Sequence, residues 1–204
     1  RYDFVFPESR KSKGTENIRM LIHAIQNSSV VEFVYIKFDG TDYHVRKVKP
    51  YGLKEVKGRW YLLAVEIDGN PEEAGCIKTW GLDRIHGLKI KDSKFQKDAS
   101  IDIAGEFRDV FGIYSDKDKP IEEVILSFPP MGGKYNDAFP LHPSQETIVD
   151  NDKEFRIRLN VRITYDFIME LLSQSEDITV IAPKHLKESM TKIYLKAIDR
   201  FINS

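Results

Sequence analysis

The 204-residue sequence predicts a mostly β, α+β protein of two small domains, and three observations support this prediction. Short apolar runs joined by glycine turns follow one amphipathic helix in the first half, which is typical of a small SH3-type or Sm-like β-barrel. The second half follows the order β, short element, β, α, β, α, which favours a ferredoxin-like α+β sandwich. The polar stretch "SDKDKP" separates the halves. The predicted boundaries are a tail or linker at 1–14, a barrel at 15–96, a connecting helix and linker at 97–119, and an α+β domain at 120–204.

The first half opens with "TENIRMLIHAIQNSS", in which apolar residues recur at helical spacing behind Thr15, a residue that can cap the first turn. "VVEFVYIKFDG" is expected to be a strand that ends in a hairpin turn at Asp39-Gly40. The next 29 residues, "TDYHVRKVKPYGLKEVKGRWYLLAVEIDG", predict two strands joined by a turn at Lys57-Gly58. "GCIKTWGLDRIHGLKI" adds one or two further short strands.

The second half predicts a different arrangement. A helix is expected at about 101–111, before the boundary, and "IEEVILSF" is expected to be a strand. "PPMGGKYNDAFPLHPSQE" predicts a long loop or short helix, and "EFRIRLNVRI" alternates apolar and arginine positions as a strand does. A helix at about 165–174, a short strand "DITVIA" and a long helix after Pro183 complete the α+β domain.

Composition limits the possible functions. The formal net charge of −1 gives the chain as a whole no nucleic-acid or membrane footprint, so an anion site has to be local. Cys76 is the only cysteine, which excludes an intrachain disulfide and a multi-cysteine zinc site and favours a cytoplasmic setting. No apolar stretch is long enough to predict a membrane-spanning helix. Because the chain starts at Arg1, we expect it to be a fragment.

An enzyme would need convergent acid, base, nucleophile or metal-ligand patterns. The five histidines are scattered, and the sequence contains no HExxH, GxSxG, GxGxxG or phosphate-binding glycine loop. "PPMGGK" holds a glycine pair, for which a turn is the better interpretation. We therefore expect no catalytic residue, no cofactor and no metal site, with an unrecognised enzyme as a remote alternative.

The stretch between His44 and Trp60 is locally basic, because six lysine and arginine residues accompany a single acid, Glu55. With interleaved aromatic residues, such a surface favours anion binding with base stacking. The alternative is that the lysines are solvated and the aromatic residues form the core. Strand alternation places Trp60 and Tyr61 on opposite faces, so one is expected in the core and the other is free to line a groove.

Two sets of motifs resemble a known family. Trp60-Tyr61-Leu62, with Arg46 and "KPYGL" before it and "LDRI" after it, closely resembles the WYL domain of bacterial transcription regulators. In the second half "HPSQ", "EFRIRLNV" and "DITVIAPKHL" resemble the C-terminal extension that accompanies WYL domains. The resemblance covers the chain from about Thr15 to its end.

This resemblance implies an Sm-like barrel that senses a nucleotide or a short single strand of nucleic acid, in a homodimeric regulator. Family members usually bind operator DNA through an N-terminal helix-turn-helix domain, and no such pattern precedes Thr15. The alternative is a structural dimerisation or interaction module with no small ligand.

The same resemblance assigns roles to individual residues. The residues implied to contact phosphate are Arg46, Lys78 and Arg84, and those implied to offer a stacking face are Tyr61 or Tyr35. Trp60 and Leu62 are implied to belong to the barrel core. Many family members carry arginine, an aromatic residue and arginine where this chain has Lys78, Trp80 and Gly81. A lysine is a point charge, whereas an arginine offers a bidentate fork to phosphate.

Overall fold

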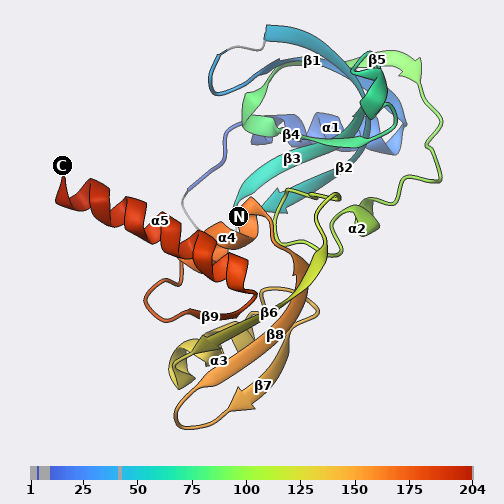
Figure 1. The fold of residues 1–204 in the computed structure, drawn as a ribbon. Coiled ribbons are helices and arrows are strands. Elements are labelled where there is room, and N and C mark those ends of the chain that lie inside the picture. Colours follow the sequence, from blue (N-terminus) through green and yellow to red (C-terminus); the bar gives the residue numbers. More distant parts are fainter. Residues whose placement is uncertain (1–3, 5–9, 41–42, 204) are drawn as a thin grey trace. The chain divides into compact units, whose positions relative to one another are not determined.

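The computed structural model describes residue 4 and residues 10–40 and 43–203, and it divides the chain into two units (Figure 1). Unit 1 comprises Arg1–Ile103 and unit 2 comprises Ala104–Ser204. The division falls inside the segment that the sequence analysis assigns to a connecting helix and linker. Each unit has its own cluster of buried apolar side chains.

Unit 1 is a five-stranded antiparallel sheet with one helix. After a 3-10 turn at Thr15–Asn17, its elements are α1 (Ile18–Gln26), β1 (Ser29–Ile36), β2 (Tyr43–Val56), β3 (Arg59–Glu66), β4 (Ile77–Gly81) and β5 (Ile85–Lys94). The strand order is β4-β3-β2-β1-β5. A 3-10 turn at Pro71–Glu73 precedes β4, and another at Leu82–Arg84 joins β4 to β5. No β4–β5 pairing occurs in the part of the chain that the structure describes, so a closed barrel is not confirmed.

The hairpin turn between β2 and β3 follows the predicted chemistry. Lys57 and Gly58 both have positive φ, 50° and 78°, as a two-residue type I′ turn requires. The turn at Asp39-Gly40 is only partly described because residues 41 and 42 lie outside the described residues. The predicted cap of α1 is wrong, because the helix begins at Ile18 and no side chain caps it. The Thr15 hydroxyl donates to the Ser12 carbonyl instead, at 3.4 Å.

Unit 2 has the order β-α-β-β-α-β followed by a final helix. Its elements are α2 (Ile103–Glu106, which begins at the last residue of unit 1), β6 (Ile121–Phe128), α3 (Pro130–Ala138), β7 (Glu146–Asp150), β8 (Phe155–Arg162), α4 (Tyr165–Leu172), β9 (Thr179–Ala182) and α5 (Lys184–Ile202). The sheet order is β7-β8-β6-β9, and every pair of neighbouring strands is antiparallel. The inward side chains of β6 and β8 are buried under α4 and the start of α5.

Two expectations for this half are wrong. The helix expected at 101–111 is a single turn, Ile103–Glu106, and the chain continues in turns. The strand β7 was missed, because "ETIVD" is short and its two apolar residues are adjacent rather than alternating.

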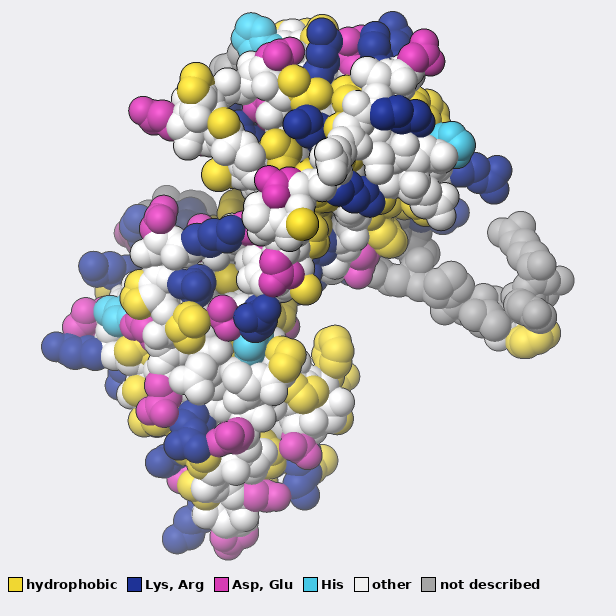
Figure 2. All heavy atoms as spheres, turned by 90° about the vertical axis from the view of Figure 1, so that its right-hand side faces the viewer, with side chains coloured by type: hydrophobic (Ala, Val, Ile, Leu, Met, Phe, Trp, Pro, Cys, Tyr) yellow, Lys and Arg dark blue, Asp and Glu magenta, His cyan; other side chains and the backbone are white. Residues whose placement is uncertain are grey.

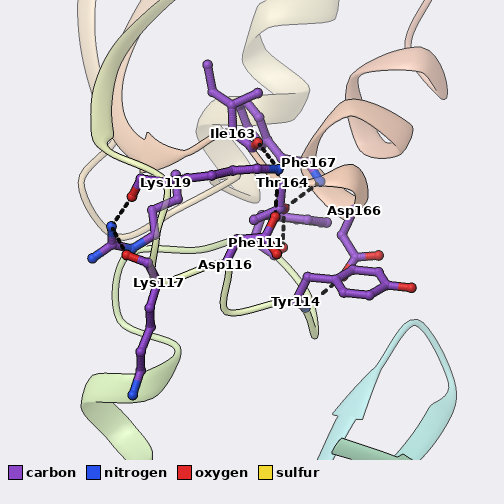
Figure 3. A network of polar contacts seen from close by, with 10 residues as sticks. Phe111, Tyr114, Asp116, Lys117, Lys119, Ile163, Thr164, Asp166 and Phe167 are labelled. Carbon is purple, nitrogen blue, oxygen red and sulfur yellow. Dashed lines mark hydrogen bonds and ion pairs between the residues drawn. The ribbon is translucent and has the colours of Figure 1, made fainter. Parts of the chain in front are cut away.

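The segment after α2 is fixed to unit 2 by polar contacts with its backbone (Figure 3). We call residues 107–120 the docked segment. The Asp166 carboxylate accepts the backbone N–H of Tyr114 at 3.3 Å (Figure 3). It also accepts the backbone N–H of Ile113 at 2.7 Å. The Thr164 hydroxyl donates to the Phe111 carbonyl at 3.3 Å and also caps α4. The docked segment is therefore an ordered part of unit 2.

Candidate anion-binding site

The Trp-Tyr-Leu motif lies at the start of β3 and contributes to both faces of the sheet. Leu62 and Ala64 are fully buried, and Trp60 packs against the same cluster. Tyr61 is half-buried and pairs across the sheet with Lys54 and Gly81.

Tyr35 lies in the core of unit 1. It is 6% exposed, and its ring makes an edge contact with Trp80 at a centroid distance of 4.9 Å. Its hydroxyl accepts the backbone N–H of Gly81 at 3.3 Å. Burial raises the pKa of Tyr35 above its ordinary value of 10.0, although the charge of Arg84 opposes this shift. The ring is therefore a packing element in this structure, with little surface left for a base.

Arg84 lies over aromatic rings at the surface of this core. Its guanidinium carbon is 5.4 Å from the centre of the Tyr35 ring and 4.8 Å from that of Phe38. Gly81 provides the space, since a Cβ there would lie 2.3 Å from an Arg84 guanidinium nitrogen. The Arg84 guanidinium thus lies directly against the Gly81 backbone.

Arg46 and Lys78 converge on one carboxylate, that of Glu66. Arg46 Nη1 lies 2.8 Å from Glu66 Oε1, and Lys78 Nζ lies 2.8 Å from Glu66 Oε2. Lys78 also contacts Glu73 at 2.6 Å. We call these four residues the Glu66 centre. Arg46 additionally lies 5.8 Å from the centre of the Trp80 ring.

The contacts within the Glu66 centre shift the pKa values of Glu66 and Lys78. Burial alone would raise the pKa of Glu66, but the hydrogen bonds and charges of Lys78 and Arg46 together lower it below 4.5. Burial likewise opposes the charge of Lys78, but its contacts with Glu66 and Glu73 raise the pKa of Lys78 above 10.5. All three groups are charged at neutral pH.

A basic hollow of about 430 Å³ lies elsewhere on unit 1. Five cationic side chains line it: Arg10, Lys11, Lys13, Lys57 and Arg59. Among the described residues, the one acid in its lining is Asp83, which lies 3.6 Å from Arg59. Phe38 also lines the hollow and is 76% exposed. The Arg84 guanidinium lies over the Phe38 ring. The hollow therefore combines a surplus of positive charge with an accessible aromatic face.

Gly14 brings the N-terminal cations to this hollow. It has a φ of 84°, and a Cβ there would lie 2.0 Å from the carbonyl oxygen of Leu82. Only glycine allows the backbone to pass this close to the 3-10 turn that holds Asp83 and Arg84. The residues just before Gly14 thus meet the β2–β3 hairpin, which supplies Lys57 and Arg59.

The sequence patterns predict a tail or linker at 1–14. They do not indicate that Phe38 or Glu66 contributes to a site. The run "RKSKG", basic residues followed by glycine, could have indicated a fixed basic segment. Glu66 had no local pattern, because its partners are 20 and 12 residues away.

On the face drawn in Figure 2, lysine and arginine side chains are interspersed with aspartate and glutamate side chains on both units. Such mixing agrees with a net charge of −1. Positive charge on this face is therefore a local property.

The "HPSQ" motif of unit 2 binds backbone groups. His142 Nδ1 accepts the N–H of Ser144 at 3.1 Å, so its Nε2 carries the proton and donates to the Arg108 carbonyl at 2.7 Å. The Ser144 hydroxyl bonds both backbone groups of Asn160. The Gln145 amide donates to the Asn136 carbonyl at 2.7 Å. The motif therefore joins the docked segment, β8 and α3.

Residues 4, 10–40 and 43–203 contain neither a cluster of potential metal ligands nor a long apolar helix. No group of three or more His, Cys, Asp or Glu side chains among these residues is placed to hold a metal ion. Within the same residues, no helix combines the length and apolar character needed to cross a membrane.

Comparison with solved structures gives likenesses in fold. Proteasome accessory factor B/C (PafBC) of Arthrobacter aurescens is 17% identical with a TM-score of 0.41, and the match covers 92% of this chain and 27% of that chain. A CRISPR Cas-related protein is 13% identical with a TM-score of 0.54, and the match covers 93% of this chain and 53% of that chain. Only the second score is high enough to indicate a shared fold.

Sequence comparison finds one known domain family in each unit. Protein PafB of Mycobacterium tuberculosis and of Mycobacterium bovis is 32% identical over 74 residues, which is 36% of this chain and 21% of each relative. This chain therefore matches only about a fifth of the length of these curated relatives. A model of the WYL domain matches residues 16–90, and a model of the WCX domain matches residues 121–197. Unit 1 thus contains a WYL domain, and unit 2 contains the WCX domain that follows it.

Proposed function

We propose that unit 1 is the ligand-sensing part of a bacterial transcription regulator and binds a nucleotide or a short single strand of nucleic acid in the basic hollow. The supporting observation is the lining of that hollow, in which the described residues place five cations and one carboxylate around an exposed phenylalanine. Lysine and arginine neutralise phosphates, and aromatic faces stack bases without sequence preference.

The proposal gives Arg84 and Phe38 a joint role. Their stacking, at 4.8 Å, presents a flat cationic surface next to the hollow. A guanidinium held on an aromatic ring keeps its outer edge available to a phosphate oxygen. The mobility of the Arg84 side chain is reduced by Asp83, 3.4 Å away, so less conformational entropy is lost on binding.

The remaining parts of the proposal concern the whole regulator. Operator DNA would be read by a helix-turn-helix domain outside these 204 residues, in a homodimer working in the cytoplasm. Unit 1 would adopt the Sm-like barrel that its family implies. A ligand changes DNA affinity only if it binds one arrangement of the dimer better than another. The proposal assigns no catalytic activity and no cofactor to either unit.

The test is a fluorescence-anisotropy titration of a short labelled single-stranded oligonucleotide at two salt concentrations. Arg59→Ala should weaken binding about fivefold to tenfold and lower the slope of log K against log salt by about 0.7. Arg158→Ala is the matched control, since it removes the same charge from unit 2. Equal loss in both variants, or no binding by the unchanged protein, would contradict the proposal.

A second candidate function is a dimerisation module without a ligand, and one observation favours it. Met131, Tyr135 and Phe139 are spaced four residues apart along and just beyond α3, and they are 82%, 83% and 83% exposed. Exposed apolar stripes of this kind mark association surfaces. Sedimentation equilibrium of the Tyr135→Glu variant distinguishes the two functions, because a change from dimer to monomer together with no oligonucleotide binding by the unchanged protein would favour this alternative.

A further inference from the structure

The Glu66 centre has the geometry of an occupied anion site. An arginine and a lysine from different strands each place a nitrogen 2.8 Å from one carboxylate. The sheet register explains this convergence, because Glu66 pairs with Val48, two residues after Arg46, and Lys78 pairs with Ala64, two residues before Glu66. The three side chains are therefore diagonal neighbours on one face of β2, β3 and β4.

This site can be reached from solvent through its cations. The Glu66 side chain is 7% exposed, whereas those of Arg46 and Lys78 are 24% and 28% exposed. The two cations thus lie between the carboxylate and water. A phosphate group accepts the same charge-assisted hydrogen bonds as a carboxylate and carries more charge, so it is the ligand class that such donors fit best.

The Glu66 side chain lies beside the bend that follows β3. The Glu66 backbone lies at the end of β3, and the next residue remains fixed by the bond from Ile67 N to the Lys47 carbonyl at 2.9 Å. Gly69 lies beside the carboxylate, since a Cβ there would be 2.6 Å from Glu66 Oε2. At position 69 the chain thus places no side chain against the carboxylate, and we expect another anion to replace it by rotation of Glu66 without opening of the sheet.

We infer that Arg46 and Lys78 form a phosphate subsite that Glu66 occupies in the absence of ligand, and that a ligand phosphate takes the place of the Glu66 carboxylate. Glu66 then sets a threshold, because weakly binding monoanions do not displace it. The assignment of this phosphate to an oligonucleotide or nucleotide rests on the proposed function, whereas the subsite itself does not.

The first experiment is thermal unfolding of the full chain in inorganic phosphate and in chloride at equal ionic strength. Phosphate should raise the unfolding midpoint of Glu66→Gln by about 3 °C relative to chloride, because the vacated cations bind it. The unchanged protein and Glu32→Gln should shift by less than about 1 °C. Glu32 is the matched control, since it is also a partly buried carboxylate of unit 1, 3.6 Å from Lys91. Equal shifts in all three proteins would overturn the subsite.

A second variant keeps the inference testable if Glu66→Gln does not fold. If Glu66→Gln shows no cooperative transition in chloride, Glu66→Ala is unfolded and refolded in chloride and in phosphate. Recovery of the transition in phosphate alone supports the subsite, and absence of recovery in both overturns it.

The second experiment separates the inference from the proposed function. In the anisotropy titration, Glu66→Gln should bind the oligonucleotide about tenfold more tightly than Glu32→Gln, since no carboxylate competes. Equal affinity of these two variants, with weaker binding by Arg59→Ala, would overturn the displacement of Glu66 by an oligonucleotide phosphate and leave the proposed function intact. A phosphate-specific thermal shift without oligonucleotide binding by any variant would support a subsite for free phosphate and overturn the proposed function.

Discussion

The two units use their polar side chains in different ways. In unit 1, Arg46, Glu66 and Lys78 bind one another at the edge of the core, and the basic hollow gathers cations around few acids. In unit 2, Thr164 and Asp166 bind backbone groups of the docked segment. Bonds from side chains to backbone fix a chain path, whereas cations facing an open hollow have capacity for an anion.

The arginines illustrate the same difference. Along β8, Arg156 makes two hydrogen bonds with Glu154, at 3.1 and 2.8 Å, and Arg158 lies 2.6 Å from Glu146. Unit 2 thus supplies these arginines with their own carboxylates. In unit 1, the described residues that line the hollow supply one carboxylate for five cations. The comparison teaches that an anion site is indicated by the local ratio of cations to carboxylates rather than by the number of arginines.

The largest expected effect on stability concerns the core of unit 2. It tests whether unit 2 has a structural role only, while unit 1 binds the ligand. Phe167 is fully buried and packs against Phe111 of the docked segment at a centroid distance of 6.5 Å. Phe167→Ala should lower the free energy of unfolding by about 3–5 kcal/mol, measured by urea denaturation. Phe201→Ala, at an exposed position of α5, should change it by less than about 0.5 kcal/mol. Loss of oligonucleotide binding in a folded Phe167→Ala protein would break the division of roles.

Replacement of Asp166, also in unit 2, should have a smaller effect on the free energy of unfolding. Asp166→Ala leaves the N–H groups of Ile113 and Tyr114 without their carboxylate acceptor and should cost about 1–3 kcal/mol of stability. Asp166→Asn retains one acceptor oxygen and should recover about half of this loss. Hydrogen exchange at Ile113 should accelerate in the alanine variant, and unchanged exchange there would contradict the role of this contact.

Much of the fold follows from local sequence patterns. The Lys57-Gly58 turn, the helix after Thr164 and the long helix after Pro183 are predicted correctly because turn chemistry and apolar spacing act over a few residues. The expected helix at 101–111 shows the limit of this reasoning. Its buried residue Val110 packs in irregular structure, after the single helical turn Ile103–Glu106.

The site is less predictable, because it depends on strand register. Arg46, Glu66 and Lys78 meet only because β2, β3 and β4 pair with one particular offset. A shift of one residue would place Glu66 on the opposite face from its partners. The contribution of the "RKSKG" stretch to the hollow depends in turn on the contact between Gly14 and Leu82. Neither relation is visible within a short window of sequence.

Two exposed phenylalanines allow a sharper comparison of the units. Phe38 of unit 1 lines the hollow and is 76% exposed, and Phe139 of unit 2 is also largely exposed. Phe38→Ala should weaken binding of the labelled oligonucleotide about tenfold, because it removes a stacking face and the support of Arg84. Phe139→Ala should leave the affinity unchanged. The proposed role of the hollow fails if the two variants lose affinity equally.

The smallest effect is the pH dependence of the Glu66 centre. The pKa of Glu66 in the folded protein lies below 4.5, so its contribution to stability is complete above that pH and is lost as pH falls through the folded value. The pKa of Lys78 lies above 10.5, so its contribution is complete below that pH and is lost as pH rises further.

The difference in free energy of unfolding between the unchanged protein and Glu66→Gln should therefore be constant across neutral pH, at roughly 1 kcal/mol, because both cations keep access to water. It should shrink as pH falls below 4.5. Urea denaturation at a series of pH values measures this difference, and Glu73→Gln, which removes only the more exposed contact of Lys78, serves as the control. A difference that persists undiminished well below pH 4.5 would show that Glu66 acts through packing rather than charge. The contrast between a charged centre in unit 1 and backbone-directed polar contacts in unit 2 would then no longer hold.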